Sequence, residues 1–313
     1  MLQNTNRGSS LSVVLKLLAV TLLWSLCFPL ITTGLAGAPP LYFAALRAAA
    51  AGVFLIGAAA VARRPFPTGA STWLVLSGLG VSYTALGFGG MFLAGGKISP
   101  GLAQVLANTQ PLIAAVLAFA FLGVKPGKGL GVVLMIGFAG IVLVALPGFT
   151  GADRNSNPAG VAFVLLGAAG IAVGNVVLKR YAKQIDPLMA TGWQFLLGSV
   201  PLAVGAGIFE KTASIHWSLS FVLVLLTLAI PGTAVASALW FSLVRHGELN
   251  RLNVYTFLTP LFALLLGAAF YSERLSLLEF GGTAVVLSAT ALAAGVRPAS
   301  LLSGRSFLFD NIL

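Results

Sequence analysis

The sequence predicts an all-α integral membrane protein with ten transmembrane helices in two inverted five-helix repeats. Three observations predict this fold class: the composition, the spacing of apolar runs and an internal repeat. Of the 313 residues, 58% are hydrophobic and 8% are charged, and the mean hydropathy is +1.00. A soluble domain carries about 25% charged residues, which cover its surface. The composition therefore largely excludes soluble enzymes, disordered proteins and nucleic-acid binders.

Apolar runs long enough to cross a bilayer occur ten times along the chain. A transmembrane helix needs about 20 mostly apolar residues, whereas a barrel strand alternates over about ten. The breaks between the runs are short and rich in turn residues, so they leave no room for a soluble domain. The predicted spans are 13–35, 40–62, 72–95, 99–123, 128–147, 159–181, 187–208, 218–243, 251–271 and 276–296.

The basic residues indicate the orientation of these spans. The net charge is +11, but Lys and Arg occur one to three at a time between apolar runs. Thirteen of the 18 basic residues fall in segments on one side of the membrane and four on the other, with Arg47 inside the second span. Because Lys and Arg accumulate in cytoplasmic loops, we expect a multi-pass protein of the cell (inner) membrane with both termini in the cytoplasm.

Self-comparison indicates that the chain is duplicated. A shift of 149 residues aligns Pro111 with Pro260, and a shift of 147 aligns Arg47 with Gln194. Each unit holds five spans, and an odd number inverts the second copy relative to the first. Inverted repeats are typical of secondary transporters, whose substrate site lies near the midplane between the copies. The predicted division is a first repeat at 1–148, a linker at 149–158, a second repeat at 159–297 and a tail at 298–313.

Short motifs in several spans resemble a known family. Leu23-Trp24, Ala45-Leu46-Arg47 and Asn108-Thr109-Gln110-Pro111 look like the EamA branch of the drug/metabolite transporter superfamily, and most like its YddG-type bacterial amino acid exporters. The resemblance covers nearly the whole chain. It implies a basket of ten helices around a central cavity lined by spans 1, 3, 4, 6, 8 and 9, with spans 5 and 10 at the back.

Polar and aromatic residues in those spans are the candidate site. Polar groups in the bilayer are costly, so each needs a partner or a function. Gln104 and Asn108 are four residues apart and therefore share a helix face. Interhelical hydrogen bonding and core packing are the alternative explanation for each residue. The candidate substrate-binding residues are Trp24, Phe28, Tyr83, Phe88, Met91, Gln104, Asn108, Asn175, Trp240, Asn253, Tyr255 and Thr256.

Four further residues have expected mechanical or electrostatic roles. Pro111 and Pro260 interrupt helical hydrogen bonding, and Gly174 allows close helix contact, so we expect bending or gating there. Arg47 begins roughly 10 Å inside its span, at 1.5 Å per residue. It is either a substrate-carboxylate clamp or gate, or a structural residue that snorkels to the outer interface or binds free carbonyls. The peripheral place of span 2 in the family favours the structural role.

The acidic residues bear on coupling. All seven lie in loops, in the tail or at helix ends, whereas proton-coupled pumps usually carry a carboxylate or histidine inside the membrane. We therefore expect facilitated diffusion or exchange, with export of amino acids, aromatic and other neutral ones, by alternating access. The alternatives are a multidrug or cationic-compound exporter, a lipid flippase-like protein, a membrane enzyme or a channel.

Other kinds of activity and partner are not expected from the sequence. Cys27 is the only cysteine, which rules out a cysteine-based metal site. Buried catalytic groups are not visible, so we expect no enzymatic activity, no metal and no cofactor. The expected partners are a small amino acid-like substrate and membrane lipids, without nucleic acid, and the expected state is a monomer.

Overall fold

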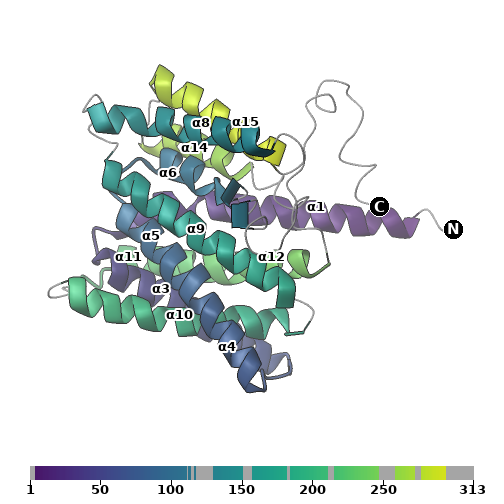
Figure 1. Cartoon of the computed structure of the whole chain (residues 1–313). Helices are drawn as coiled ribbons and strands as arrows, with labels where there is room; N and C mark the ends of the chain where they lie inside the picture. The colour runs from purple at the N-terminus through teal and green to yellow at the C-terminus, as the bar shows by residue number, and fades with distance from the viewer. Residues whose placement is uncertain are drawn as a thin grey trace.

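A computed structural model describes residues 4–110, 112–113, 116–117, 130–150, 157–181, 184–210, 215–246, 258–271 and 276–293. Across these ranges every element of regular structure is a helix (Figure 1). In chain order the elements are α1 (Asn4–Ser25), α2 (Cys27–Gly34), α3 (Pro40–Val61), α4 (Ala70–Leu79), η1 (Gly80–Leu86), α5 (Gly87–Ala94), α6 (Pro100–Ala107), α8 (Leu130–Thr150), α9 (Pro158–Tyr181), α10 (Pro187–Phe209), α11 (Leu219–Ala229), η2 (Ile230–Val235), α12 (Ala236–His246), α14 (Leu258–Tyr271) and α15 (Leu277–Ala293).

Six of the helical segments have the length and hydropathy to cross a membrane. Large apolar side chains such as Leu74, Met135 and Phe209 are about three-quarters exposed, which suits contact with lipid and would be unusual on a soluble surface. The other predicted spans contain α6, α8, α14 and α15, and the total of ten remains a prediction. The six segments are Val13–Gly34, Pro40–Val61, Ala70–Ala94, Pro158–Leu178, Pro187–Phe209 and Leu219–Val244.

Proline and capping side chains define where several helices begin. Pro40, Pro100, Pro158 and Pro187 each occupy the first position of a helix, where the absence of an N–H group costs nothing. The Asp186 carboxylate accepts hydrogen bonds from two backbone N–H groups in the first turn of α10, at 3.0 and 3.2 Å. The breaks predicted from turn residues are therefore real helix boundaries at these four positions.

Helices at equivalent places in the two predicted repeats pack against each other. α3 packs on α10, α6 on α14 and α8 on α15; Figure 1 shows α8 and α15 together along the top edge of the bundle. The first pair approaches so closely that a Cβ atom on Gly52 would lie 2.8 Å from the Leu196 backbone nitrogen. Pairing of like with like is what a two-fold relation between the repeats produces.

Two of the spans are interrupted by π-helical turns. η1 lies between α4 and α5, and η2 lies between α11 and α12. The shift of 149 residues that relates the two halves places η1 on η2. Since π-helical turns inside α-helices are rare and often mark functional sites, their occurrence at matching positions directs attention to the space between them.

Candidate functional site

A cavity of about 70 Å³ lies among helices from both halves of the chain. α1, α2, α3, α5, α6, α9, α12 and both π-helical turns contribute to its walls, together with Gln110 just beyond α6. Six of the residues predicted to bind substrate are among those that line it. The lining residues are Trp24, Cys27, Phe28, Arg47, Tyr83, Phe88, Met91, Gln104, Gln110, Ile171, Gly232, Thr233 and Ser237.

Arg47 lies at the wall of this cavity and is 3% exposed. Its Nε atom donates to the Thr233 hydroxyl at 2.7 Å, and Nη2 donates to the Cys27 Sγ atom at 3.2 Å. The guanidinium group therefore faces the protein interior. The expectation that this arginine snorkels to the outer interface is wrong, because side chains of span 1 and span 8 supply nearer acceptors.

The π-helical turn η2 is part of the same hydrogen-bond network. The Thr233 hydroxyl donates to the Leu228 carbonyl, five residues earlier, at 2.6 Å. The Cys27 thiol lies 3.8 Å from the Gly232 carbonyl, within range of a weak S–H donor. Arg47 is thus connected to the altered backbone of η2 as well as to α2.

Aromatic rings flank the Arg47 guanidinium. Its central carbon lies 4.5 Å from the ring centre of Phe88 and 5.6 Å from that of Phe92, distances that permit cation–π attraction. The Phe88 ring in turn stacks on Phe195, with centroids 5.5 Å apart. These rings fix the plane of the guanidinium group.

The Arg47 guanidinium lacks an acidic partner among the described residues. Its Nη1 atom is buried without a hydrogen-bond acceptor. The three acids that the structure describes are engaged elsewhere: Asp186 caps α10, Glu210 accepts from two backbone N–H groups of α3, and Glu279 accepts from Ser276. Among the described residues, the cavity wall therefore carries a positive charge that no carboxylate pairs with.

Asn175 and Trp240 lie beside the cavity and do not line it. The Trp240 indole Nε1 donates to the Asn175 Oδ1 atom at 3.2 Å, and the Trp240 ring lies 5.3 Å from that of Trp24. This pair satisfies a buried amide and positions a cavity-lining ring. Gly174, one residue away, continues α9 without a break, and a Cβ atom there would lie 2.7 Å from the Tyr83 Cβ atom.

Span 4 presents a different pair of amides from the one expected. The two amides that line the cavity are Gln104 and Gln110. Asn108, the second amide expected there, is the C-cap of α6, which ends at Ala107. The next residue is Pro111, which has no N–H group for the Ala107 carbonyl. Asn108 is buried, and its Nδ2 atom has no described partner.

Some predicted residues fall outside the described part of the chain. Pro260 is the third residue of α14, but its side chain is not described. The others are Pro111, Asn253, Tyr255 and Thr256.

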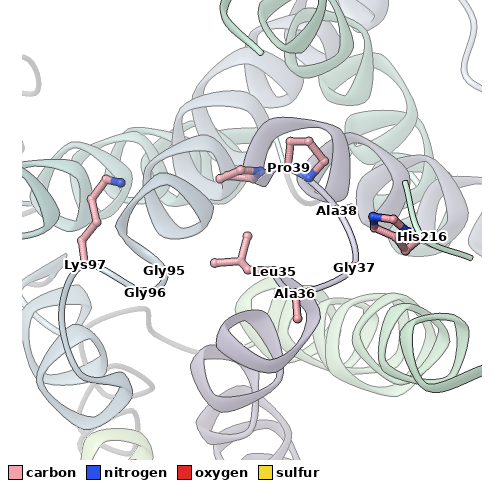
Figure 2. Close-up of a pocket in the computed structure, with 10 residues that line it drawn as sticks. Leu35, Ala36, Gly37, Ala38, Pro39, Gly95, Gly96, Lys97 and His216 are labelled. Atoms are coloured by element: carbon pink, nitrogen blue, oxygen red, sulfur yellow. The ribbon is translucent and has the colours of Figure 1, made fainter. Parts of the chain in front are cut away.

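A second and larger pocket, of about 530 Å³, opens at the loop end of the bundle. Figure 2 shows Lys97 and His216 on opposite sides of it, with Leu35 between them. Most of its wall is glycine, alanine and proline, which offers few side-chain donors or acceptors.

A buried aromatic cluster stands between this loop-end pocket and the central cavity. On α3, Phe43 lies one turn from Arg47 toward the loop end, and on α5, Phe92 lies one turn from Phe88 in the same direction. The Phe43 ring is 4.9 Å from that of Phe92 and 5.2 Å from that of Phe221. All three side chains are buried. These three rings therefore pack together on the loop-end side of Arg47.

The chemistry available in the cavity is that of binding. Within the described ranges, no three His, Cys, Asp or Glu side chains gather as a metal site would require. The cavity combines aromatic rings, two amides, three hydroxyls (Tyr83, Thr233 and Ser237) and one guanidinium group. Sequence reasoning missed Gln110, Thr233 and Ser237 there; the shift of 149 residues, which places Thr84 on Thr233, could have drawn attention to the second of these.

The comparisons with known proteins agree with one another. The EamA-like transporter family model matches residues 11–146 and 158–295. A WAT1-related chloroplastic protein of Arabidopsis thaliana is 35% identical over 264 residues, which are 80% of this chain and 61% of that protein. The chain thus spans about three-fifths of the Arabidopsis protein's length.

Two bacterial relatives match along most of their lengths. The protein PecM of Dickeya dadantii is 30% identical over 286 residues, covering 90% of this chain and 91% of PecM. The uncharacterized inner membrane transporter YedA of Escherichia coli is 28% identical over 277 residues, covering 88% of each. A crystal structure of a protein 20% identical in sequence superposes with a TM-score of 0.65 over 91% of this chain and 97% of that one, which shows a shared fold.

Proposed function

The chain belongs to the EamA-like transporter family, and from that premise we propose that it exports small metabolites across the inner membrane, namely amino acids, both aromatic and other neutral ones. Its multi-pass helical structure and its relatives support transport in general. The observation that carries the finer proposal is the central cavity, in which aromatic rings and amides surround one small space.

The cavity lining suits the two parts of an amino acid. Trp24, Phe28 and Tyr83 offer ring faces to an apolar or aromatic side chain. Gln104 and Gln110 carry amide groups that can both donate and accept, as a zwitterion requires. The positive charge of Arg47 disfavours the alternative of a cationic-compound exporter, because a cation would meet like charge in a low-dielectric site.

Alternating access is the proposed mechanism. At about 70 Å³ the cavity is smaller than the 300–1,000 Å³ typical of ligand pockets, so binding an amino acid requires helices to separate. Phe43, Phe92 and Phe221 pack together on the loop-end side of Arg47 and are the proposed closure there. That side is the outer one if both termini are cytoplasmic. The turns η1 and η2 are the proposed hinges, because a π-helical turn leaves the hydrogen-bond register locally adjustable.

Coupling is proposed to be by exchange or facilitated diffusion. The described acids cap helices or pair at the ends of the bundle, and none lines the central cavity. The substrate gradient then supplies the driving force. The proposed transporting unit is the monomer, because residues of a single chain line the cavity.

Flux into liposomes that contain the purified protein tests this function. A panel of labelled amino acids is offered with and without an imposed pH gradient, and we expect saturable flux that ignores the gradient and is stimulated by amino acid on the opposite side. Flux that follows the proton gradient would contradict uncoupled transport. Flux of lipids or organic cations without amino acid flux would overturn the substrate class, and flux that never saturates would indicate a channel.

A matched pair of tryptophan variants connects that flux to the cavity. Trp24→Ala removes a lining ring, and we expect it to change the order of preferred substrates and to lower aromatic amino acid flux at least tenfold. Trp217→Ala, at a side chain 59% exposed outside the cavity, serves as the control and should leave preference unchanged.

A further inference from the structure

The Arg47 guanidinium is built into the cavity wall with part of its hydrogen-bonding capacity unused. A guanidinium group has five N–H donors. One on Nε reaches Thr233 and one on Nη2 reaches Cys27, while the buried Nη1 atom has no acceptor. A buried cation without a counter-charge is strongly disfavoured in a membrane protein and usually marks a functional site.

The geometry of the Arg47 guanidinium group indicates which chemical group would satisfy its unused donors. The Nη1 and Nη2 atoms form one side of a planar fork that matches the two oxygens of a carboxylate. The three described acids, Asp186, Glu210 and Glu279, accept hydrogen bonds elsewhere in the bundle, and none of them lines the cavity. The described part of the chain offers no carboxylate to this fork, so a molecule that enters the cavity is the candidate acceptor.

We propose that Arg47 is the anchor for the substrate carboxylate. This inference rests on the proposed function and deepens it, because it assigns the residue that selects amino acids and other carboxylates over amines. Phe88 lies 4.5 Å from the guanidinium carbon and holds the fork in plane. Trp24 and Phe28 line the same cavity and are placed to receive the substrate side chain.

Three probes that share a phenyl ring on a short carbon chain distinguish the contribution of the carboxylate from that of the ammonium group. Phenylalanine carries a carboxylate and an ammonium group, phenylpropionate keeps only the carboxylate, and phenylethylamine keeps only the ammonium group. In wild-type liposomes we expect phenylpropionate to compete with phenylalanine uptake, and phenylethylamine to compete at least tenfold more weakly. Equal competition by the two would overturn the anchor while leaving amino acid transport intact.

Variants assign the selectivity to Arg47. We expect Arg47→Gln to raise the half-saturating phenylalanine concentration at least tenfold without changing competition by phenylethylamine, and Arg47→Lys to retain part of the affinity, since it keeps charge without the fork. Arg64→Gln removes an arginine whose side chain is 53% exposed and is the control. Unchanged phenylalanine affinity in a folded Arg47→Gln protein would refute the proposal.

A measurement on the wild-type protein keeps the proposal testable if the variants do not fold. A ligand that binds the folded state raises the melting temperature, so phenylalanine and phenylpropionate should raise it and phenylethylamine should not. If phenylpropionate stabilises the protein but phenylalanine is neither bound nor transported, the anchor stands and the amino acid proposal falls. If no carboxylate stabilises it, the anchor falls.

Discussion

The two π-helical junctions of the molecule are built alike and differ in charge. At one junction, η2 meets α3, where the Arg47 Nε atom donates to the Thr233 hydroxyl at 2.7 Å. At the other, η1 meets α10, where the Thr84 hydroxyl donates to the Gln194 carbonyl at 3.3 Å. The shifts of 149 and 147 residues that place Thr84 on Thr233 and Arg47 on Gln194 therefore exchange the two contacts, as a two-fold relation does.

A second pair of contacts differs in size. The Cys27 thiol lies 3.8 Å from the Gly232 carbonyl, and the equivalent residues, Gly174 and Tyr83, are in close contact at the other junction. At one junction the glycine lies in the π-helical turn (Gly232), and at the other the glycine lies in the neighbouring helix (Gly174). At the η1 junction the Tyr83 side chain covers α9, whereas at the η2 junction a glycine leaves room beside a cysteine and an arginine.

The comparison teaches that two halves with similar backbones can form a cavity whose two sides differ in charge. Shared small residues let the repeats pack closely, while the exchanged side chains place one positive charge on one wall of the cavity. A substrate with a charged head and an apolar body would then bind in one orientation. Four experiments can break or sharpen this comparison.

Exchanging the two unlike residues should have the largest effect. In the double variant Arg47→Gln with Gln194→Arg, the charge moves to the junction where Tyr83 packs against α9. We expect phenylalanine flux to fall at least fiftyfold, because the charge no longer lines the cavity. Flux and selectivity are measured in liposomes, with a monodisperse elution profile as the folding control; wild-type selectivity would show that the junctions are interchangeable.

The glycines at the two junctions should respond differently to alanine. At Gly174 a Cβ atom would lie 2.7 Å from the Tyr83 Cβ atom, whereas at Gly232 the nearest atom would be 3.3 Å away. We expect Gly174→Ala to cost about 1–3 kcal/mol by overpacking and Gly232→Ala to cost less than half as much. Thermal melting of the purified variants measures both, and equal losses would contradict the assigned packing.

Replacing Thr233 and Thr84 by valine compares how much the hydrogen bond of each hydroxyl contributes to stability. Thr233→Val leaves the Arg47 Nε atom unpaired, and a buried unsatisfied donor costs about 1–3 kcal/mol. Thr84→Val removes a longer bond to a backbone carbonyl, which is worth about 0.5–1.5 kcal/mol. The two melting temperatures should therefore fall in that order, and the reverse order would argue against Arg47 depending on Thr233.

Removing the exposed arginine Arg64 should have the smallest effect on stability and flux. Arg64 lies 3.9 Å from Asp186 with its side chain 53% exposed, and exposed ion pairs contribute about 0–1 kcal/mol. Arg64→Gln should therefore shift the melting temperature only slightly and leave flux unchanged. A loss as large as that of Arg47→Gln would mean that charge removal alone, wherever it occurs, impairs the protein.

The helical fold was largely predictable from the sequence because hydrophobic length and turn residues are local signals. Pro40, Pro100, Pro158 and Pro187 mark helix starts that the structure places where the breaks were expected. The π-helical turns were not predicted, because residues such as Thr84 in η1 and Pro231 in η2 also occur in ordinary membrane helices and do not by themselves indicate a change of hydrogen-bond register. Their position became visible only from the backbone.

The lining of the candidate site was predictable in its aromatic part and less so in its polar part. Large rings such as Trp24 and Phe88, in spans that face the centre, line the cavity as expected. Asn175 could not be placed from spacing alone, because its partner, Trp240, is 65 residues away. The snorkelling alternative for Arg47 was wrong for the same reason: the acceptors that hold its side chain come from spans 1 and 8, far away along the chain.

The separation along the chain between Arg47 and Thr233 has a consequence for biogenesis. The ribosome must add 186 further residues after Arg47 before this acceptor exists. An arginine disfavours insertion of a membrane helix, by about 2.5–3.5 kcal/mol at the helix centre and by less nearer its ends. Span 2 thus enters the bilayer with its charge incompletely satisfied, and chains truncated before span 8 keep that defect, so membrane quality control has a chemical basis for distinguishing unfinished chains from finished ones.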